Sequence, residues 1–207
     1  MAKCDGYSGF TKDTAENLLL DAGAFFIDFD IEEDDFESAV EDGKLLGATR
    51  GGGNFTAEPE IRDIEIDGVR GAAKGLSVID EWTITMTANV LEVTKDSLAS
   101  ALTASEVGES ANEKYDTIRA KNCIDLDDYH DNITYVGKIS GADEPLIIQI
   151  HNAINSNGLT LETEDQDEAV TEMEFKGHYD FDDLEHAPFT IYYPKRDQEN
   201  DDGGVEG

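Results

Sequence analysis

The stretch Trp82-Thr83-Ile84-Thr85-Met86-Thr87-Ala88-Asn89-Val90 alternates apolar and polar side chains, with the polar positions mostly threonine. Side chains of an extended strand point to opposite faces in turn, so the apolar residues share one face and the polar residues share the other. Such a strand covers a hydrophobic core on one side and meets polar surroundings on the other. The stretch therefore predicts a mainly β fold.

Further segments rich in β-branched and aromatic residues follow at intervals typical of a β-sandwich or barrel. They are Ala24–Asp30, Ile61–Ile66, Tyr115–Ile124, Ile133–Ser140, Leu146–His151, Val170–Tyr179 and Phe189–Tyr193. In Val170–Tyr179, Glu172, Glu174 and Lys176 lie opposite the apolar residues, which predicts a wet or interfacial sheet face.

Two segments change to a helical pattern. Thr94 is a good N-cap for a helix that runs to Leu102, because Asp96 falls in the first turn and Leu98 lies four residues before Leu102. Residues 13–23 predict a second short helix that ends at Gly23. The expected fold class is a β-sandwich or barrel with one flanking α-helix, a long loop arm and flexible termini.

The chain divides into three parts in this interpretation. Residues 1–23 form an N-terminal arm with its short helix, and residues 24–194 form the β domain. Within that domain, residues 31–60 combine an acidic run with a glycine cluster and predict a long irregular loop arm. Residues 195–207 are polar and acidic and predict a flexible tail.

The composition excludes several classes of function. The chain has 207 residues with 15 Lys+Arg and 48 Asp+Glu, a net charge of −33. Proteins that wrap nucleic acid or adhere to anionic lipid need clustered basic residues, so neither function is expected. No apolar run reaches the roughly 20 residues of a membrane helix, and no signal-peptide core follows Met1. We expect a soluble protein that does not bind membranes, whose acidity also fits adaptation to salt.

Motifs for catalysis and metal binding fail at particular positions. The segment from Asp28 begins like a calcium loop but has Glu33 in place of the required glycine and Ala39 in place of the final glutamate. The glycine cluster has Gly53 where a phosphate-binding loop needs lysine. The four histidines lack zinc-site spacing. We expect no catalytic residue, no metal and no cofactor.

The order of several segments resembles the phage tail tube protein family, the major tail proteins of tailed bacteriophages. The matching segments are Ala15–Ala24, Gly47–Phe55, Pro59–Gly68, Lys74–Leu76 with the threonine-rich strand, Asn157–Leu159 and Asp167–Asp180. The resemblance covers about residues 14–194, with many short matches and no single diagnostic signature. The acidic stretch 32–42 and the tail after Lys195 depart from the family pattern.

The resemblance implies a structural virion protein that assembles in the host cytoplasm. Its subunits would form hexameric rings stacked into a hollow tail tube, with strands from all subunits closing one barrel around the lumen. The implied partners are further copies, the tape-measure protein, the tail terminator and the distal tail proteins, with DNA passing through transiently. Overall resemblance favours the long non-contractile type (siphovirus), and the tube of a contractile tail is the nearest alternative.

Two sets of residues are the candidate sites of this interpretation. A negative lumen would repel DNA phosphates, and carboxylates on the expected hairpin strands are the candidates for its lining: Glu60, Asp63, Glu65, Glu92, Glu172 and Glu174. The candidate inter-subunit loop comprises Arg50, Gly51, Gly52, Gly53 and Phe55. Two other functions stay open at this point, a salt-adapted β-sandwich binding module and a calcium-dependent surface domain.

Overall fold

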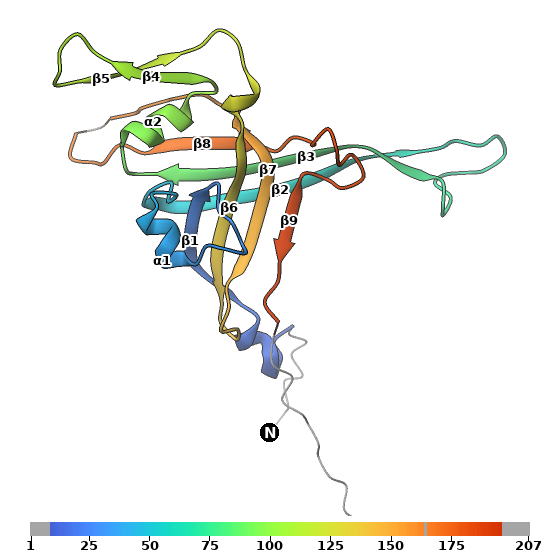
Figure 1. Cartoon of the computed structure of the whole chain (residues 1–207). Coiled ribbons are helices and arrows are strands. Elements are labelled where there is room, and N and C mark those ends of the chain that lie inside the picture. The colour runs from blue at the N-terminus through green and yellow to red at the C-terminus, as the bar shows by residue number, and fades with distance from the viewer. Residues whose placement is uncertain (1–8, 164, 196–207) are drawn as a thin grey trace, which may run out of the picture.

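The structure is a computed structural model that describes residues 9–163 and 165–195. An antiparallel seven-stranded sheet curls into a half-barrel in the order β1-β6-β7-β8-β3-β2, and β9 also pairs with β7 (Figure 1). A separate hairpin, β4–β5, lies above it in this view. The strands are β1 (Leu19–Ile27), β2 (Thr49–Asp63), β3 (Ser77–Val90), β4 (Ser105–Glu109), β5 (Asp116–Ala120), β6 (His130–Ile139), β7 (Leu146–Asn155), β8 (Thr171–Lys176) and β9 (Phe189–Tyr192). The prediction of a mainly β sandwich or barrel fold is confirmed.

The core occupies the concave side of the half-barrel. On β3, Ile84, Met86, Ala88 and Val90 are buried while the intervening threonines are not, as the alternation predicts. These side chains pack with buried residues of the other strands: Phe25, Ile133, Ile150, Ala153, Met173 and Phe175. The polar sides of β3 and β8 consequently share the convex face of the sheet.

Two short helices pack on the sheet, α2 (Lys95–Ala101) against the main core and α1 (Phe36–Glu41) against a separate small cluster. The predicted helix is α2, whose N-cap Thr94 accepts a hydrogen bond from the Ser97 amide at 3.0 Å. The second helix, α1, packs on the outer side of β1 and β6 in a small cluster of Phe26, Phe29, Ala39 and Val136. Two 3-10 turns, η1 (Lys12–Glu16) and η2 (Leu126–Asp128), complete the structure.

Two sequence predictions about the first 60 residues were wrong. The expected helix over 13–23 stops at Glu16, and β1 begins at Leu19 because its backbone pairs with β6 from Leu19 opposite Ile139 onward. The expected loop arm 31–60 contains α1 and most of β2. Local composition suggested a loop there, but pairing of β2 with β3 over most of its length makes the segment a strand.

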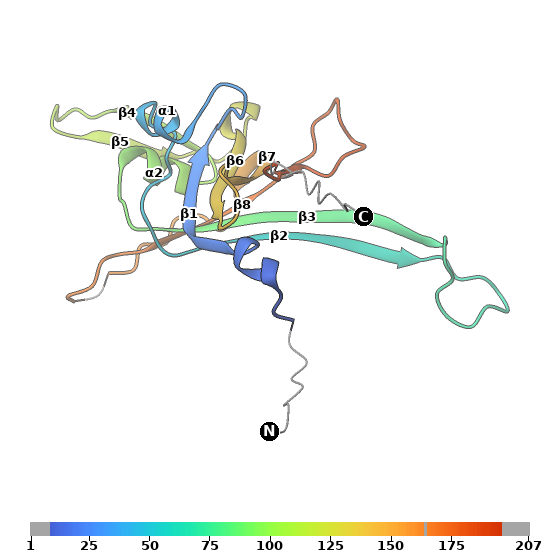
Figure 2. The same ribbon diagram turned by 90° about the horizontal axis from the view of Figure 1, so that it is seen from below.

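The β2–β3 hairpin projects far beyond the rest of the molecule (Figures 1 and 2). Its projecting part comprises Ile61–Asp63, the connecting residues 64–76 and Ser77–Ile79, and is called the hairpin extension below. The expected strand Ile61–Ile66 lies here, although β2 already ends at Asp63. The predicted flexible tail, apart from Lys195, and residues 1–8 of the N-terminal arm lie outside the described residues.

Candidate functional site

The convex face of β2, β3 and β8 is polar. We call it the polar sheet face, and alternation places on it Asn54, Thr56, Glu58, Glu60, Glu81, Thr83, Thr85, Thr87, Asn89, Glu172, Glu174 and Lys176. Strand pairing lines these residues up in rows, so that Thr87 lies between Asn54 and Glu174. Five carboxylates and one lysine give the face a negative charge.

Three of the six candidate lumen residues lie on the polar sheet face. Glu172 is exposed, Glu174 accepts a hydrogen bond from the Ser156 hydroxyl at 2.8 Å, and Glu60 pairs across the hairpin with Glu81. Two carboxylates directly opposite each other repel in an isolated subunit. Sequence reasoning missed Glu58 and Glu81, because their place in these rows depends on a strand pairing that no local pattern reveals.

The other three candidates lie elsewhere. Asp63 and Glu65 belong to the hairpin extension, where Asp63 accepts a hydrogen bond from the Ser77 hydroxyl at 2.6 Å. Glu92 follows the end of β3 and accepts a hydrogen bond from the Ala48 amide at 3.0 Å, which fixes the entry to β2. The six carboxylates therefore form no single cluster.

The candidate inter-subunit residues do not form a loop, so that part of the prediction was wrong. They belong to β2, with Gly51 and Gly52 at positive φ in an irregular stretch of the strand. The Arg50 guanidinium donates to Asp167 at 2.7 Å and to Glu168 at 3.0 Å, which ties the β7–β8 connection to the start of β2. This pairing lowers the pKa of Asp167.

Gly53 and Phe55 contact other strands of the same subunit. A Cβ atom on Gly53 would clash with the Phe25 ring and with the Thr87 carbonyl oxygen, so β2 crosses β1 here at a distance that only glycine allows. The Phe55 ring packs against Phe189 with centroids 5.6 Å apart. The glycine cluster is therefore a close crossing of two strands.

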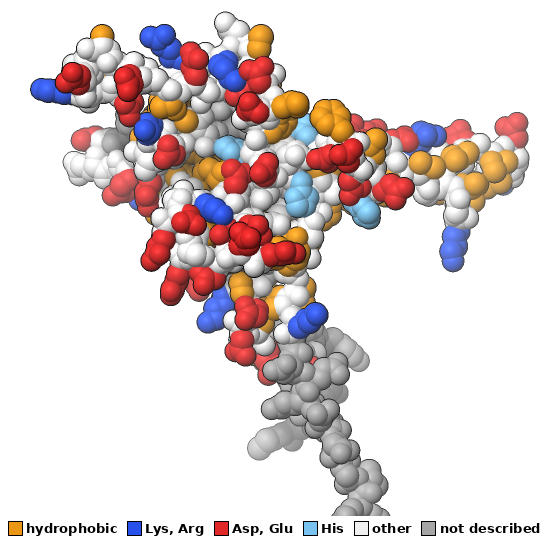
Figure 3. All heavy atoms as spheres, viewed as in Figure 1, with side chains coloured by type: hydrophobic (Ala, Val, Ile, Leu, Met, Phe, Trp, Pro, Cys, Tyr) orange, Lys and Arg blue, Asp and Glu red, His pale blue; other side chains and the backbone are white. Residues whose placement is uncertain are grey.

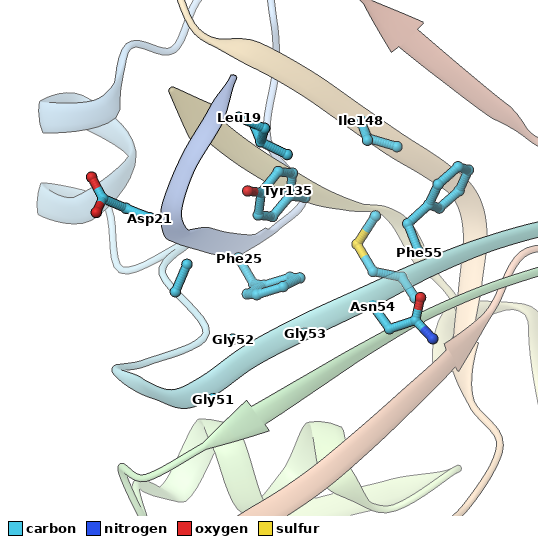
Figure 4. Close-up of a pocket in the computed structure, with 12 residues that line it drawn as sticks. Leu19, Asp21, Phe25, Gly51, Gly52, Gly53, Asn54, Phe55, Tyr135 and Ile148 are labelled. Atoms are coloured by element: carbon cyan, nitrogen blue, oxygen red, sulfur yellow. The ribbon is translucent and has the colours of Figure 1, made fainter. Parts of the chain in front are cut away.

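A cavity of about 340 Å³ opens where β1 and β2 approach each other (Figure 4). The side chains that converge on it are mainly apolar, among them Leu19, Phe25, Phe55, Tyr135 and Ile148. Burial raises the pKa of Tyr135, and Asp21, the carboxylate of the cavity lining, points away from the other lining side chains (Figure 4). The cavity offers apolar contact and no grouping suited to general acid–base chemistry.

The acidic segments have structural roles where the structure describes them. The Asp34 carboxylate accepts hydrogen bonds from the Lys44 ammonium and from the Asp30 amide, which lower its pKa. Within residues 9–163 and 165–195, no three His, Cys, Asp or Glu side chains are placed to hold a metal ion. In the same residues, no helix is long and apolar enough to cross a membrane.

The edges of the sheet are the remaining candidate surface. β2 is the last strand of the sheet order, and β8 pairs with β3 only over Thr85–Val90. Over the part of the chain that the structure describes, Ser77–Thr83 of β3 therefore pair on the β2 side alone. Exposed strand edges of this kind are templates for pairing with another chain.

No protein-family model and no curated protein sequence matches this chain.

Proposed function

We propose that this protein is the subunit of a phage tail tube, a structural protein that forms hexameric rings stacked into a hollow conduit for DNA. One observation carries the proposal: the long β2–β3 hairpin joins open strand edges to a polar, carboxylate-bearing sheet face. Lateral pairing of these edges between copies would extend the sheet around a ring. The polar sheet face would then line the lumen, because the core occupies its opposite side.

Assembly also accounts for the exposed parts of the hairpin. Edge pairing satisfies backbone groups that water alone satisfies in the single subunit, and a closed ring leaves no edge for uncontrolled pairing. The exposed Ile61 and Ile79 of the hairpin extension lie directly opposite each other on adjacent strands. A neighbouring subunit would cover them and gain apolar burial.

The charge of the polar sheet face suits a DNA conduit. A basic lumen would hold phosphates through counterion release, and that affinity would accumulate along the tube. Glu58, Glu60, Glu81, Glu172 and Glu174 instead repel phosphates and leave a hydrated path. The same carboxylates repel each other between copies, so higher salt favours ring formation.

The proposed partners follow from this role. Stacked rings form an open-ended polymer, so a tape-measure protein sets the length, and terminator and distal tail proteins close the two ends. The protein would act in the virion after assembly in the host cytoplasm. A flexible, non-contractile tail is the proposed setting, and the tube of a contractile tail would use the same surfaces.

Negative-stain electron microscopy of the purified protein tests self-assembly. We expect six-fold rings or hollow tubes whose number rises with protein concentration and with salt. Single particles under every condition would contradict self-assembly and favour a monomeric acidic binding module.

A charge reversal then tests the conduit. Tubes of Glu172→Lys/Glu174→Lys are expected to retain short double-stranded DNA at low salt, whereas wild-type tubes exclude it. The matched control is Glu106→Lys/Glu109→Lys, which makes the same charge change on β4, away from the polar sheet face. Equal DNA retention by the two variants would contradict a lumen lined by the polar sheet face.

A further inference from the structure

An exposed apolar patch lies between η2 and the segment that follows β8. Leu126, Tyr129, Tyr179 and Phe181 surround a cavity of about 340 Å³, and Tyr129 packs edge-on against His178 at its wall. Leu126 is 72% exposed and Phe181 is 85% exposed. Large apolar side chains grouped around an open cavity mark a surface that contacts another protein. We call it the Phe181 patch.

The rim of the Phe181 patch is acidic. Asp125 and Asp127 flank Leu126, while Asp180 and Asp182 flank Phe181. Lys121 pairs with Asp125 at 3.1 Å, and Asp180 accepts a hydrogen bond from the Asp182 amide. The patch therefore selects a partner that combines apolar side chains with basic groups.

The hairpin extension has this combination. Ile64, Ile66 and Val69 are 44%, 50% and 48% exposed, and Arg70 and Lys74 are exposed beside them. Residues 61–76 carry three basic and three acidic residues, whereas the whole chain has a net charge of −33. Figure 3 shows hydrophobic side chains along much of the extension. Its tip is the segment of this chain whose chemistry best complements the Phe181 patch.

We propose that the tip of the hairpin extension of one copy docks on the Phe181 patch of a second copy. The extension projects away from the body in both views, so its own patch is out of reach in this conformation (Figures 1 and 2). The contact joins two different surfaces, so it repeats from copy to copy and propagates an assembly. This docking proposal rests on the proposed self-assembly and names the two surfaces that meet when copies assemble.

Charge reversal on each side, followed by their combination, tests the contact. Arg70→Glu/Lys74→Glu and Asp180→Lys/Asp182→Lys are each expected to raise the concentration for half-maximal assembly about tenfold or more. The combined variant is expected to recover most of this loss, because the charges again attract. Lys114→Glu/Arg119→Glu, on and beside β5, makes the same charge change as the tip reversal and controls for total charge. Equal effects of tip and control reversals, with no recovery on combination, would overturn the proposal.

Cysteine cross-linking locates the contact in the same assemblies. In a Cys4→Ser/Cys123→Ser background, Ala72→Cys/Asp182→Cys is expected to form disulfide-linked multimers on oxidation. Ala72→Cys/Glu109→Cys, whose second cysteine lies on β4, is expected to remain uncross-linked. Rings without the specific cross-link would overturn this contact and leave the tail-tube proposal standing. Cross-linked multimers without rings would support the contact and contradict the tail-tube proposal.

Discussion

The inner and outer halves of the β2–β3 hairpin belong to one antiparallel strand pair, with a register shift between Glu60 and Ile61, but they lie in different surroundings. In the inner half, Ile84 and Met86 are completely buried against the other strands of the half-barrel. In the outer half, Ile61 is 59% exposed and Ile79 is 50% exposed. Both halves carry strand-type apolar residues, so the composition of a strand does not decide what covers it.

Because of this difference, we expect the inner half to determine the stability of the subunit and the outer half to determine its assembly. The inner half is held by core packing, whereas the hairpin extension is a two-stranded ribbon, which is marginally stable alone in water. Changes in the inner half should therefore unfold the subunit. Changes in the extension should leave the subunit folded and affect its contacts with other copies.

The largest expected effect comes from the same truncation at two positions of β3. Ile84→Ala removes a fully buried side chain and should lower the free energy of unfolding by about 2–5 kcal/mol. Ile79→Ala, in the extension, should change the stability of the isolated subunit by less than about 1 kcal/mol while weakening assembly. Denaturant unfolding of the unassembled protein measures both. Similar losses would mean that the extension packs as part of the core.

A glycine replacement tests the close crossing in the inner half. Gly53→Ala places a methyl group against Phe25 and the Thr87 carbonyl, so it should destabilise the subunit by roughly 1–3 kcal/mol through overpacking. Gly108→Ala, on β4, is the matched control, because its Cβ would meet only the Thr117 hydroxyl oxygen at 3.4 Å. Thermal unfolding compares the two variants. An unchanged midpoint for Gly53→Ala would contradict the crossing geometry.

The elements that were predictable from sequence have local signals. The alternation of Trp82–Val90 and the Thr94 cap define β3 and α2 without knowledge of the rest of the chain. β2 lacks such a signal, because a glycine cluster is typical of a loop. Only the folded structure shows that Gly53 is needed for the close contact with Phe25. In β1, Asp21 and Gly23 have positive φ and interrupt the pairing with β6, which hides the strand from any periodic pattern.

The candidate site residues also fall into two groups, those that one strand alone predicts and those that depend on the folded chain. Glu172 and Glu174 share a face because alternation within one strand is local, and the sequence predicts this. The carboxylate row that includes Glu60 and Glu81 requires the β2–β3 register, which the sequence leaves open. The Phe181 patch joins residues more than fifty positions apart, so only the folded chain reveals it.

Acid should destabilise the body of the subunit, by less than the core substitutions above. The hairpin extension contains no histidine, so this effect should come from the body alone. Burial lowers the pKa of His151 from its usual 6.5, and it lowers the pKa of His130 despite the opposing charge of Asp28. Below about pH 6.5 the unfolded chain therefore binds more protons than the folded chain, so stability falls as the pH falls. We expect the unfolding midpoint to decrease between pH 7.5 and 5.5.

Two histidine replacements locate the source of that pH dependence. His151→Gln and His130→Gln should each make the unfolding midpoint less dependent on pH, because each removes an imidazole whose pKa is lowered by burial. Thermal melts across this pH range measure the slopes. Identical slopes for wild type and His151→Gln would assign the acid sensitivity to other groups.

The smallest expected effect concerns the ion pair at the base of the extension. The Arg62 guanidinium contacts both oxygens of Asp80, at 2.7 and 3.0 Å, but both side chains are largely exposed, so water and salt screen the pair. Asp80→Asn should therefore leave the unfolding midpoint of the isolated subunit unchanged within error.

Asp34→Asn is the comparison in the body, because the Asp34 side chain is only 6% exposed and anchors Lys44 and the Asp30 amide. Asp34→Asn should lower the unfolding midpoint measurably, since the replacement leaves the Lys44 and Asp30 donors poorly satisfied. Equal losses in the two variants would mean that the base of the extension unfolds together with the body, and the two halves of the hairpin would then be one cooperative unit.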